Sequence, residues 1–569
     1  MTTMGFSPTS FIGVSLKHQP QRGRANSMVA SGGFFTKTFR SLYPELFMDR
    51  RSFLTTWAHN RLARPETVSA VRPMSGLEPF VPSTAQPWDA IRVGHLLRRI
   101  TFLPRWSDLD ALMKMTPSDA VDKLLDTPNA PPPPSMADHS TESLEGLTPD
   151  LENQIRGQWI GDAGALRNWY IGVLRDAGLT AAEKMAAFWS GHFTSEFEVD
   201  LEYVIGPLLY RQNKLFRDTG LGDFKQLAFN VTLDPAMLVY LGGDLNRAGA
   251  PNENYGRELM ELFTMGIGHY TEGDVKEAAR ILTGWRVSQF TDQFIPPTGL
   301  FTSYFEAKNH DINAKQFMGV SFPARDSTTN TEHIVRQEEI AKLIETIFQK
   351  RPREVARFIC RKLYTFFVYS NPAKTDAAVI EAMADIFVQN NFNIKPVMAA
   401  LLKSAHFYDN ANIGAQIKTP MEFEVGLARQ LGATGSLYGE MRAMGQDLFD
   451  PPNVSGWPGY RDWITTTTYP VRADAARRVI GAMDDNAVLT FIKQFPQYDD
   501  VNELVKSLGA LLLPRPLSAG RKGIFVKKLV GGAPDYEWAG IVENSPSTAA
   551  RNMKDLMQTI AELPDFQLC

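Results

Sequence analysis

Apolar residues recur at intervals of three and four along most of this chain, and no other feature limits its fold as strongly. Such intervals place apolar side chains on one face of a helix, whereas a half-buried strand needs strict alternation of apolar and polar residues. Few stretches of the chain alternate in that way. The sequence therefore predicts a mainly α fold, a large multi-helical body with at most short strands.

The periodic spacing starts near Trp88, and Pro104 ends the first run. We expect Ser107 to cap a second helix, because serine is a favoured N-cap residue, and a third helix to begin at Ser118. A helical pattern continues from Leu151 to about residue 285, and further helices are expected over residues 332–350, 353–369, 374–389 and 394–403.

Changes in composition divide the chain. Residues 127–150 form a Pro-rich flexible connector, stiff and extended at its prolines and mobile in the polar stretch from Ser135 to Asp150. Residues 286–335 form an irregular excursion rich in aromatic residues, glycine and proline, and residues 447–469 form a Pro/Gly/Trp-rich loop. The predicted organisation is a poorly ordered tail over residues 1–75, a main helical domain over 76–480, and a C-terminal helical region over 481–569 that packs on the main domain.

The charge balance and the cysteine count exclude several classes of protein. The 59 basic and 63 acidic side chains leave a net charge of −4, without the clustered Lys and Arg that sequence-independent nucleic-acid binding needs. Two cysteines are too few for a disulfide framework or a structural zinc site. No run approaches 18 apolar residues, so no membrane span is expected. The 44% hydrophobic content is that of a globular protein.

An arginine pair lies near the N-terminus. Arg50-Arg51 precedes Phe53-Leu54, which is similar to the core of a twin-arginine export signal. Such a signal continues into an apolar segment, but residues 55–64 include His, Asn and two arginines. Two interpretations follow: an exported, periplasmic protein, or an amphipathic N-terminal segment with a chance arginine pair.

One predicted helix carries an acidic stripe. Asn252 is expected to cap it, and steps of 100° per residue place Asn254, Glu258 and Glu261 opposite an apolar face. Gly266 and Gly268 follow, where the backbone could turn or approach a ligand. An ordinary solvated acidic face would show the same stripe. Further polar candidates around this helix are Glu253, Arg257 and His269.

The next helix supplies another carboxylate. Thr271 and Asp274 have the spacing of a capping box. Because helices joined by a short glycine turn lie antiparallel, we expect Asp274 near Glu261. Carboxylates crowded in this way raise one pKa, as a general acid requires, or chelate a divalent cation.

His310-Asp311 lies in the irregular excursion, where functional residues tend to be placed. Three interpretations are open. The pair could act as a general base with its orienting carboxylate, it could ligate a metal, or Asp311 could form an Asx-type turn.

The loop over residues 447–469 offers a different kind of site. Its prolines and glycines exclude helix and strand, so tertiary contacts must fix it. Trp457 and Trp463, with Asp450 and Asn453, could form a stacking platform for sugar rings. Alternatively, a tryptophan from this loop could plug the core.

Two histidines lie on apolar helical patterns, His95 and His192. We interpret both as core histidines whose rings bond backbone carbonyl oxygens. No GxSxG, HExxH or Walker motif occurs.

Several of these motifs together resemble one bacterial family. The matching segments are Asp234 to Met237, Ala250 to Thr264 around Asn252-Glu253-Asn254, Tyr270 to Glu272, Leu282 to Trp285, His310-Asp311, and Phe449 to Trp463. They are similar to the domain-of-unknown-function family numbered eighteen hundred, from about Trp88 to Leu568. Gly256 replaces a usual Ala in this pattern, and Tyr460 replaces a usual Gly.

The resemblance supplies no reaction, because kinship of fold does not imply function. It implies export, although the usual apolar segment after Arg51 is missing here. It also implies a genomic neighbour similar to the alkaline phosphatase and sulfatase superfamily, which is therefore a candidate partner.

The first functional hypothesis is a carboxylate-based hydrolase or lyase that acts on an envelope or extracellular polymer, a carbohydrate above all. The alternatives are a non-enzymatic helical scaffold that docks a sulfatase- or phosphatase-like partner, and a divalent-cation-dependent hydrolase. No other cofactor is expected. The residues assigned to catalysis are Glu258, Glu261, Asp274, His310 and Asp311, and those assigned to substrate binding are Asn252, Glu253, Asn254, Arg257, His269, Asp450, Asn453, Trp457 and Trp463.

Overall fold

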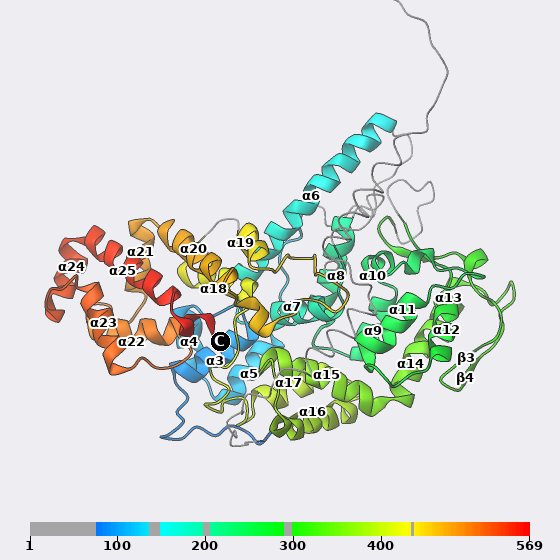
Figure 1. Cartoon of the computed structure of the whole chain (residues 1–569), viewed down its shortest axis with the longest axis horizontal. Helices are drawn as coiled ribbons and strands as arrows, with labels where there is room; N and C mark the ends of the chain where they lie inside the picture. Colours follow the sequence, from blue (N-terminus) through cyan, green and yellow to red (C-terminus); the bar gives the residue numbers. More distant parts are fainter. Residues whose placement is uncertain (1–75, 136–147, 197–204, 289–298, 434–436) are drawn as a thin grey trace, which may run out of the picture. The chain divides into compact units, whose positions relative to one another are not determined.

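The computed structural model describes residues 76–135, 148–196, 205–288, 299–433 and 437–569 (Figure 1). All of them belong to one compact unit, Arg72–Cys569. This unit is mainly α, as the apolar spacing predicts, and its strands form two small antiparallel sheets. The tail expected over residues 1–75, with Arg50-Arg51, lies outside the described residues, and the division at residue 480 stays a prediction.

The first helices are α3 (Ala90–Ile100), α4 (Trp106–Met113), α5 (Pro117–Asp126) and α6 (Pro149–Asp176). Two expected starts are wrong by one or two residues. Arg105 precedes α4, where its backbone N–H donates to Asp108 at 3.0 Å, so Ser107 lies inside the helix. Thr116 caps α5, and Pro117 occupies the first helical position, where its fixed φ suits the helix.

The central helices are α7 (Ala182–His192), α8 (Ile205–Thr219), α9 (Phe224–Thr232), α10 (Pro235–Tyr240), α11 (Glu253–Glu258) and α12 (Glu272–Ile281). A π-helical segment, η3 (Leu259–Thr264), continues α11 without a break. Gly256 allows a close approach of α11 to α12, because a Cβ at this position would lie 3.2 Å from that of Ala278. Two of the capping predictions are confirmed: Asn252 caps α11, and Thr271 with Asp274 forms the capping box of α12.

The irregular excursion carries the short strands that the sequence allowed. β1 (Trp285–Val287) pairs with β2 (Ser303–Phe305), and β3 (Lys315–Phe317) pairs with β4 (Val320–Phe322). Met318 and Gly319 join β3 to β4, with φ of 47° and 77°. Positive φ at both positions is typical of the tight turn that suits the twist of a hairpin.

The helices after the excursion are α13 (Glu332–Val335), α14 (Ala341–Lys350), α15 (Pro352–Phe367), α16 (Ala377–Gln389) and α17 (Ile394–Leu402). They match the expected ranges closely. The structure adds one feature that the spacing did not indicate: a second π-helical segment, η5 (Arg336–Ile340), joins α13 to α14.

The C-terminal helices are α18 (Pro420–Leu431), α19 (Tyr438–Ala443), α20 (Thr468–Gly481), α21 (Asp485–Lys493), α22 (Val501–Leu512), α23 (Ala519–Leu529), α24 (Trp538–Asn544) and α25 (Pro546–Ala561). α25 packs against α20, α21, α23 and α24, and α22 packs against α3 (Figure 1). Arg98 of α3 donates to the carbonyl oxygens of Ala510, Leu511 and Leu513, which lie where α22 ends. A buried cation thus satisfies the free carbonyl groups of a helix C-terminus.

Aromatic side chains link the central helices in one continuous core. Trp189 of α7 stacks on Phe224 of α9 at a centroid distance of 5.4 Å, and Phe224 also lies 5.7 Å from Phe348 of α14.

Within the residues that the structure describes, no helix is long and apolar enough to cross a membrane.

Candidate functional site

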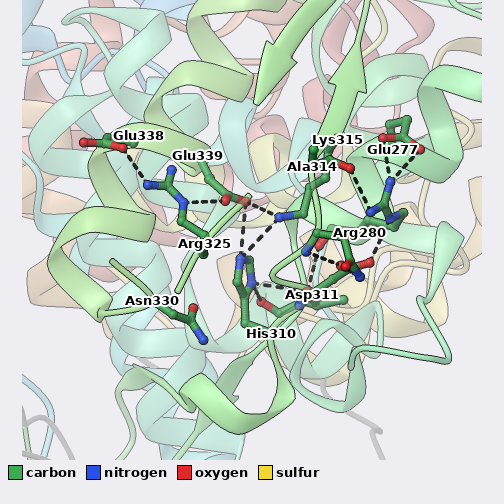
Figure 2. A network of polar contacts seen from close by, with 12 residues as sticks. Glu277, Arg280, His310, Asp311, Ala314, Lys315, Arg325, Asn330, Glu338 and Glu339 are labelled. Atoms are coloured by element: carbon green, nitrogen blue, oxygen red, sulfur yellow. Dashed lines mark hydrogen bonds and ion pairs between the residues drawn. The ribbon is translucent and has the colours of Figure 1, made fainter. Parts of the chain in front are cut away.

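A concentration of buried charge lies where α12, the irregular excursion and η5 meet (Figure 2). We call it the charged network. Arg280 comes from the last turn of α12, Lys315 begins β3, and Glu339 lies on η5. The members of the charged network are Arg280, His310, Asp311, Lys315, Arg325 and Glu339.

Glu339 is the centre of the charged network, and its side chain is 0% exposed. Its carboxylate lies 2.9 Å from Lys315 Nζ, 2.9 Å from Arg325 Nε and 3.3 Å from His310 Nε2 (Figure 2). Burial alone would raise the pKa of Glu339. The hydrogen bond with His310 and the charge of Lys315 outweigh burial, so the pKa falls to about 2. Glu339 is therefore ionised at neutral pH and neutralised by its neighbours.

His310 is held through both ring nitrogens. Nδ1 lies 2.8 Å from the carbonyl oxygen of Thr283, to which it can only donate. Nε2 faces Glu339 at 3.3 Å and Lys315 Nζ at 3.5 Å. Since neither nitrogen points to an open cavity in these contacts, the ring is placed to order the chain between α12 and β3.

Asp311 belongs to the same network but faces Arg280. It accepts a bond from Arg280 Nε at 2.8 Å and one from the backbone N–H of Asn313 at 2.9 Å. The second bond is the Asx-type turn that was one of three interpretations of this pair. Burial would raise the pKa of Asp311, but the bonds from Arg280 and Asn313 lower it to about 2. A carboxyl group with that pKa is a poor general acid at neutral pH.

No metal site emerges from these groups. Among the described ranges, no three His, Cys, Asp or Glu side chains converge as ligands for a metal ion. The positive charges of Arg280, Lys315 and Arg325 instead occupy the places that a cation would take in the charged network.

The Asn252 motif joins α11 to the preceding turn. Asn252 Oδ1 accepts the backbone N–H of Asn254 at 3.0 Å, and Asn252 Nδ2 donates to the carbonyl oxygen of Gly242 at 3.0 Å. The backbone N–H of Asn252 donates to Asn246 Oδ1 at 2.8 Å. The asparagines predicted to bind substrate thus satisfy backbone groups within the fold.

The charged residues of α11 pair across the α11–α12 turn. Arg257 donates to both carboxylate oxygens of Glu272, at 2.8 and 2.7 Å, and lies 3.6 Å from Glu253. These side chains are partly or largely exposed, so their pairing contributes little to stability. Near the same turn, the carbonyl oxygen of His269 accepts a bond from Arg351.

Glu258 and Glu261 do not share the solvated stripe that steps of 100° predict. Glu258 is 1% exposed, so the interpretation as a solvated face is wrong for it. The helix widens into η3 only after Glu258, so the changed angle per residue affects Glu261 and not Glu258. Glu261 is partly buried and accepts a hydrogen bond from the Tyr270 hydroxyl.

Asp274 was expected near Glu261, but its bonds run elsewhere. It accepts the backbone N–H of Thr271 at 2.9 Å and that of Met318, in the β3–β4 turn, at 2.9 Å. Glu261, Asp274 and Asp311 therefore bind three different sets of partners. Their contacts do not join them in one catalytic group.

The loop over residues 447–469 packs on the end of α7. Thr194 donates to the carbonyl oxygen of Val454 at 2.8 Å, and a Cβ on Gly456 would lie only 2.6 Å from the carbonyl oxygen of Gly191. Trp463 is 5% exposed, which favours the core plug over the stacking platform.

The other candidate residues of this loop, Asp450, Asn453 and Trp457, are partly buried. Trp457 has a buried indole Nε1. Asn453 Oδ1 accepts the backbone N–H of Ser455, while Asp450 lies beside the buried Phe449. These positions give the loop a defined conformation without opening two ring faces to a sugar.

Both core histidines bond backbone carbonyl oxygens, as expected. His95 Nε2 lies 3.0 Å from the oxygen of Phe407, and His192 Nε2 lies 3.0 Å from that of Phe263. His192 Nδ1 also accepts a bond from Lys362 Nζ at 2.9 Å, a residue that sequence reasoning missed. Burial lowers the pKa of Lys362 to about 8. The sequence feature that could have indicated Lys362 is its position in α15, four residues from an apolar side chain on either side.

Comparison with known proteins gives one match. The family described as "Protein of unknown function (DUF1800)" matches residues 95–568. No curated protein and no solved structure matches the chain.

Proposed function

The chain belongs to the DUF1800 family, whose function is unknown, and we propose that it acts as a non-enzymatic helical scaffold. In this proposal its buried charges hold segments of chain together and its surface docks a partner. One observation carries the proposal: each ionisable group of the charged network lies within ion-pair distance of a partner of opposite charge in the protein.

The engagement of the predicted catalytic groups supports this proposal. Asp311 is paired with Arg280, His310 is held by Thr283 and Glu339, and Asp274 caps a helix. General acid–base catalysis needs a group whose proton can reach a substrate and whose pKa lies near the working pH. The pKa of Asp311, about 2, is far from that requirement.

The partner to test first is the class that the family resemblance implies, a protein of the sulfatase and phosphatase superfamily. Sedimentation velocity of the purified chain with such a protein, encoded beside it, is expected to give a heavier complex. Sedimentation of the two proteins as independent species at micromolar concentration would contradict the partner assignment.

The structural role of the charged network has its own test. Asp311→Asn is expected to lower the free energy of unfolding by about 1–3 kcal/mol, because it weakens a partly buried charged bond to Arg280. The matched control is Asp474→Asn, which alters an exposed pair with Arg477 and is expected to cost less than 1 kcal/mol. Equal stability of the two variants would contradict the structural role.

A carboxylate-based hydrolase of an envelope or extracellular carbohydrate is the second candidate, and Glu261 favours it. This carboxylate is partly accessible and accepts a bond from the Tyr270 hydroxyl, which would orient it toward a substrate. If the protein is a scaffold, incubation with a panel of polysaccharides is expected to release no reducing ends. Release by the wild-type protein that is lost in Glu261→Gln, at unchanged stability, would overturn the scaffold proposal.

A further inference from the structure

A cleft of about 370 Å³ opens away from the groups described so far. Segments far apart in sequence meet there: α8, the junction of α9 with α10, the start of β2, and η5. Its polar lining residues are Arg211, Asn230, Asp234, Thr302, Ser303 and Arg336. A cavity of this size is within the usual range of small-molecule sites.

Arg336 is held in place on two sides. Its Nη2 lies 3.0 Å from Glu332, and its guanidinium carbon lies 5.0 Å from the centroid of the Trp285 ring. Stacking on an aromatic face leaves the edge of a guanidinium group able to donate hydrogen bonds in its own plane. The ring of Trp285 thus orients a donor that reaches the wall of the cleft.

Asp234 forms the buried end of the cleft and is 5% exposed. Its Oδ2 accepts bonds from Gln212 Nε2 at 2.8 Å and from the backbone N–H of Met237 at 2.9 Å. Burial raises the pKa of Asp234 to about 7, against the opposing effect of these bonds and of the Arg211 charge. A large fraction of the molecules therefore carry a neutral acid here at pH 7, which leaves the arginines as the dominant charge on the lining.

We propose that this cleft binds a small hydroxylated oxyanion, a sugar that carries a carboxylate or a phosphate group. Arg211 and Arg336 supply planar donor groups that match the geometry of either oxyanion. Ser303 supplies a hydroxyl group for the ring hydroxyls of the ligand. Asn230 can donate from its amide nitrogen, since its Oδ1 accepts from Gln226, and Thr302 can accept at its hydroxyl oxygen, since its proton goes to Gly299. The remaining lining residues that the cleft presents, Leu233 and Pro235, give an apolar surface for the carbon face of a sugar.

The test is isothermal titration of the full chain with four probes: glucuronate, glucose 6-phosphate, glucose and inorganic phosphate. Saturable binding is expected for glucuronate or glucose 6-phosphate, and the stronger of the two identifies the oxyanion. Glucose and inorganic phosphate are each expected to bind at least tenfold more weakly, because one lacks the charge and the other lacks the hydroxyl groups. If neither sugar anion binds at millimolar concentration, the proposal is wrong.

Variants assign the binding to this cleft. Arg211→Gln and Arg336→Gln are each expected to weaken the bound sugar anion at least tenfold. The control is Arg477→Gln, in a different surface hollow that Asp474 and Arg478 also line. This variant should bind the sugar anion with the affinity of the wild type. Arg336→Gln also removes the ion pair with Glu332 and could disturb η5. Arg336→Lys keeps the positive charge but lacks the planar donor group, and it should also bind the sugar anion at least threefold more weakly. Unchanged affinity in both glutamine variants, or an equal loss in Arg477→Gln, would place the ligand elsewhere and overturn the assignment.

Discussion

Replacement of Glu339 by glutamine tests whether the charged network holds the fold together. The substitution keeps the size of the side chain and removes the only acid that lies between Lys315, Arg325 and His310 in the described contacts (Figure 2). Lys315 has a 0% exposed side chain, and that of Arg325 is 2% exposed. Glu339→Gln therefore leaves buried positive charge without its carboxylate, which is one of the more destabilising changes a single substitution can make.

The size of the effect follows from the pKa of Glu339. Its folded value of about 2 lies about 2.5 units below the ordinary value of 4.5, and each unit corresponds to about 1.4 kcal/mol. The ionised form is thus worth about 3 kcal/mol at neutral pH, in line with the 3–5 kcal/mol typical of a broken buried pair. Because the folded pKa is depressed, this contribution is present above pH 4.5 and is lost as the pH falls toward 2.

Urea denaturation followed by tryptophan emission measures the effect, with the first transition compared because a chain of this length can unfold in steps. We expect Glu339→Gln to lower the free energy of that transition by about 3 kcal/mol at pH 7, and by progressively less below pH 4.5. The matched control is Glu338→Gln, the adjacent residue, which is 59% exposed and pairs only at the surface side of Arg325. It is expected to cost less than about 1 kcal/mol. Equal costs for the two variants, or a gap that does not shrink in acid, would refute the reasoning.

Three further substitutions probe polar groups elsewhere in the fold. Glu424 is 0% exposed, neither carboxylate oxygen has a hydrogen-bond partner among the residues that the structure describes, and burial raises its pKa to about 8. Since this folded pKa is raised, the wild type loses stability from about pH 4.5 to pH 8. Over that range the free energy of unfolding of Glu424→Gln should rise relative to that of the wild type, by at most about 5 kcal/mol, as measured by urea titration. The wild type is expected to gain stability between about pH 8 and pH 10.5, because the unfolded chain there holds a proton that the folded lysine has lost. Lys362→Met should remove this rise. If thermal melts at several pH values show the same rise in the variant, the assignment to Lys362 is wrong. Asn252→Ala should lower stability by about 1–2 kcal/mol through loss of the α11 cap, and Asn252→Asp should recover part of that loss. Calorimetry measures both variants. An alanine variant as stable as the wild type would exclude the capping role.

The helices and their caps could be predicted where the relevant residues lie within three or four positions of each other. Asn252 and the Thr271–Asp274 capping box were found in this way, and so were the ranges of α15 and α17. The same local logic failed at Ser107, because the backbone N–H of Arg105 bonds Asp108 instead and the helix starts earlier.

The charged network could be predicted only in part. His310 and Asp311 stood out because of their types, but Arg325 and Glu339 are 14 positions apart and look like ordinary solvated charges in the sequence. Lys315 did leave a signal, because it alternates with Phe317 on the buried face of β3. The partners of a buried charge depend on how distant segments pack, and a periodic pattern carries no information about that packing.

The π-helical segments limit which helix faces can be predicted from residue spacing. A π turn adds a residue to a helix without adding a turn, so a wheel drawn at 100° per residue assigns wrong faces beyond it. Glu261 lies within η3, where the wheel no longer applies, whereas Glu258 lies before η3 and its burial does not follow from the wider turn. On η5, Arg336 lines the cleft while Glu339 lies in the charged network, so a segment of five residues serves both places. An unbroken α-helix would turn residues three apart toward neighbouring directions. The wider turn at η5 is therefore the local feature that lets one helical stretch supply an arginine to a cleft and a carboxylate to a separate buried network.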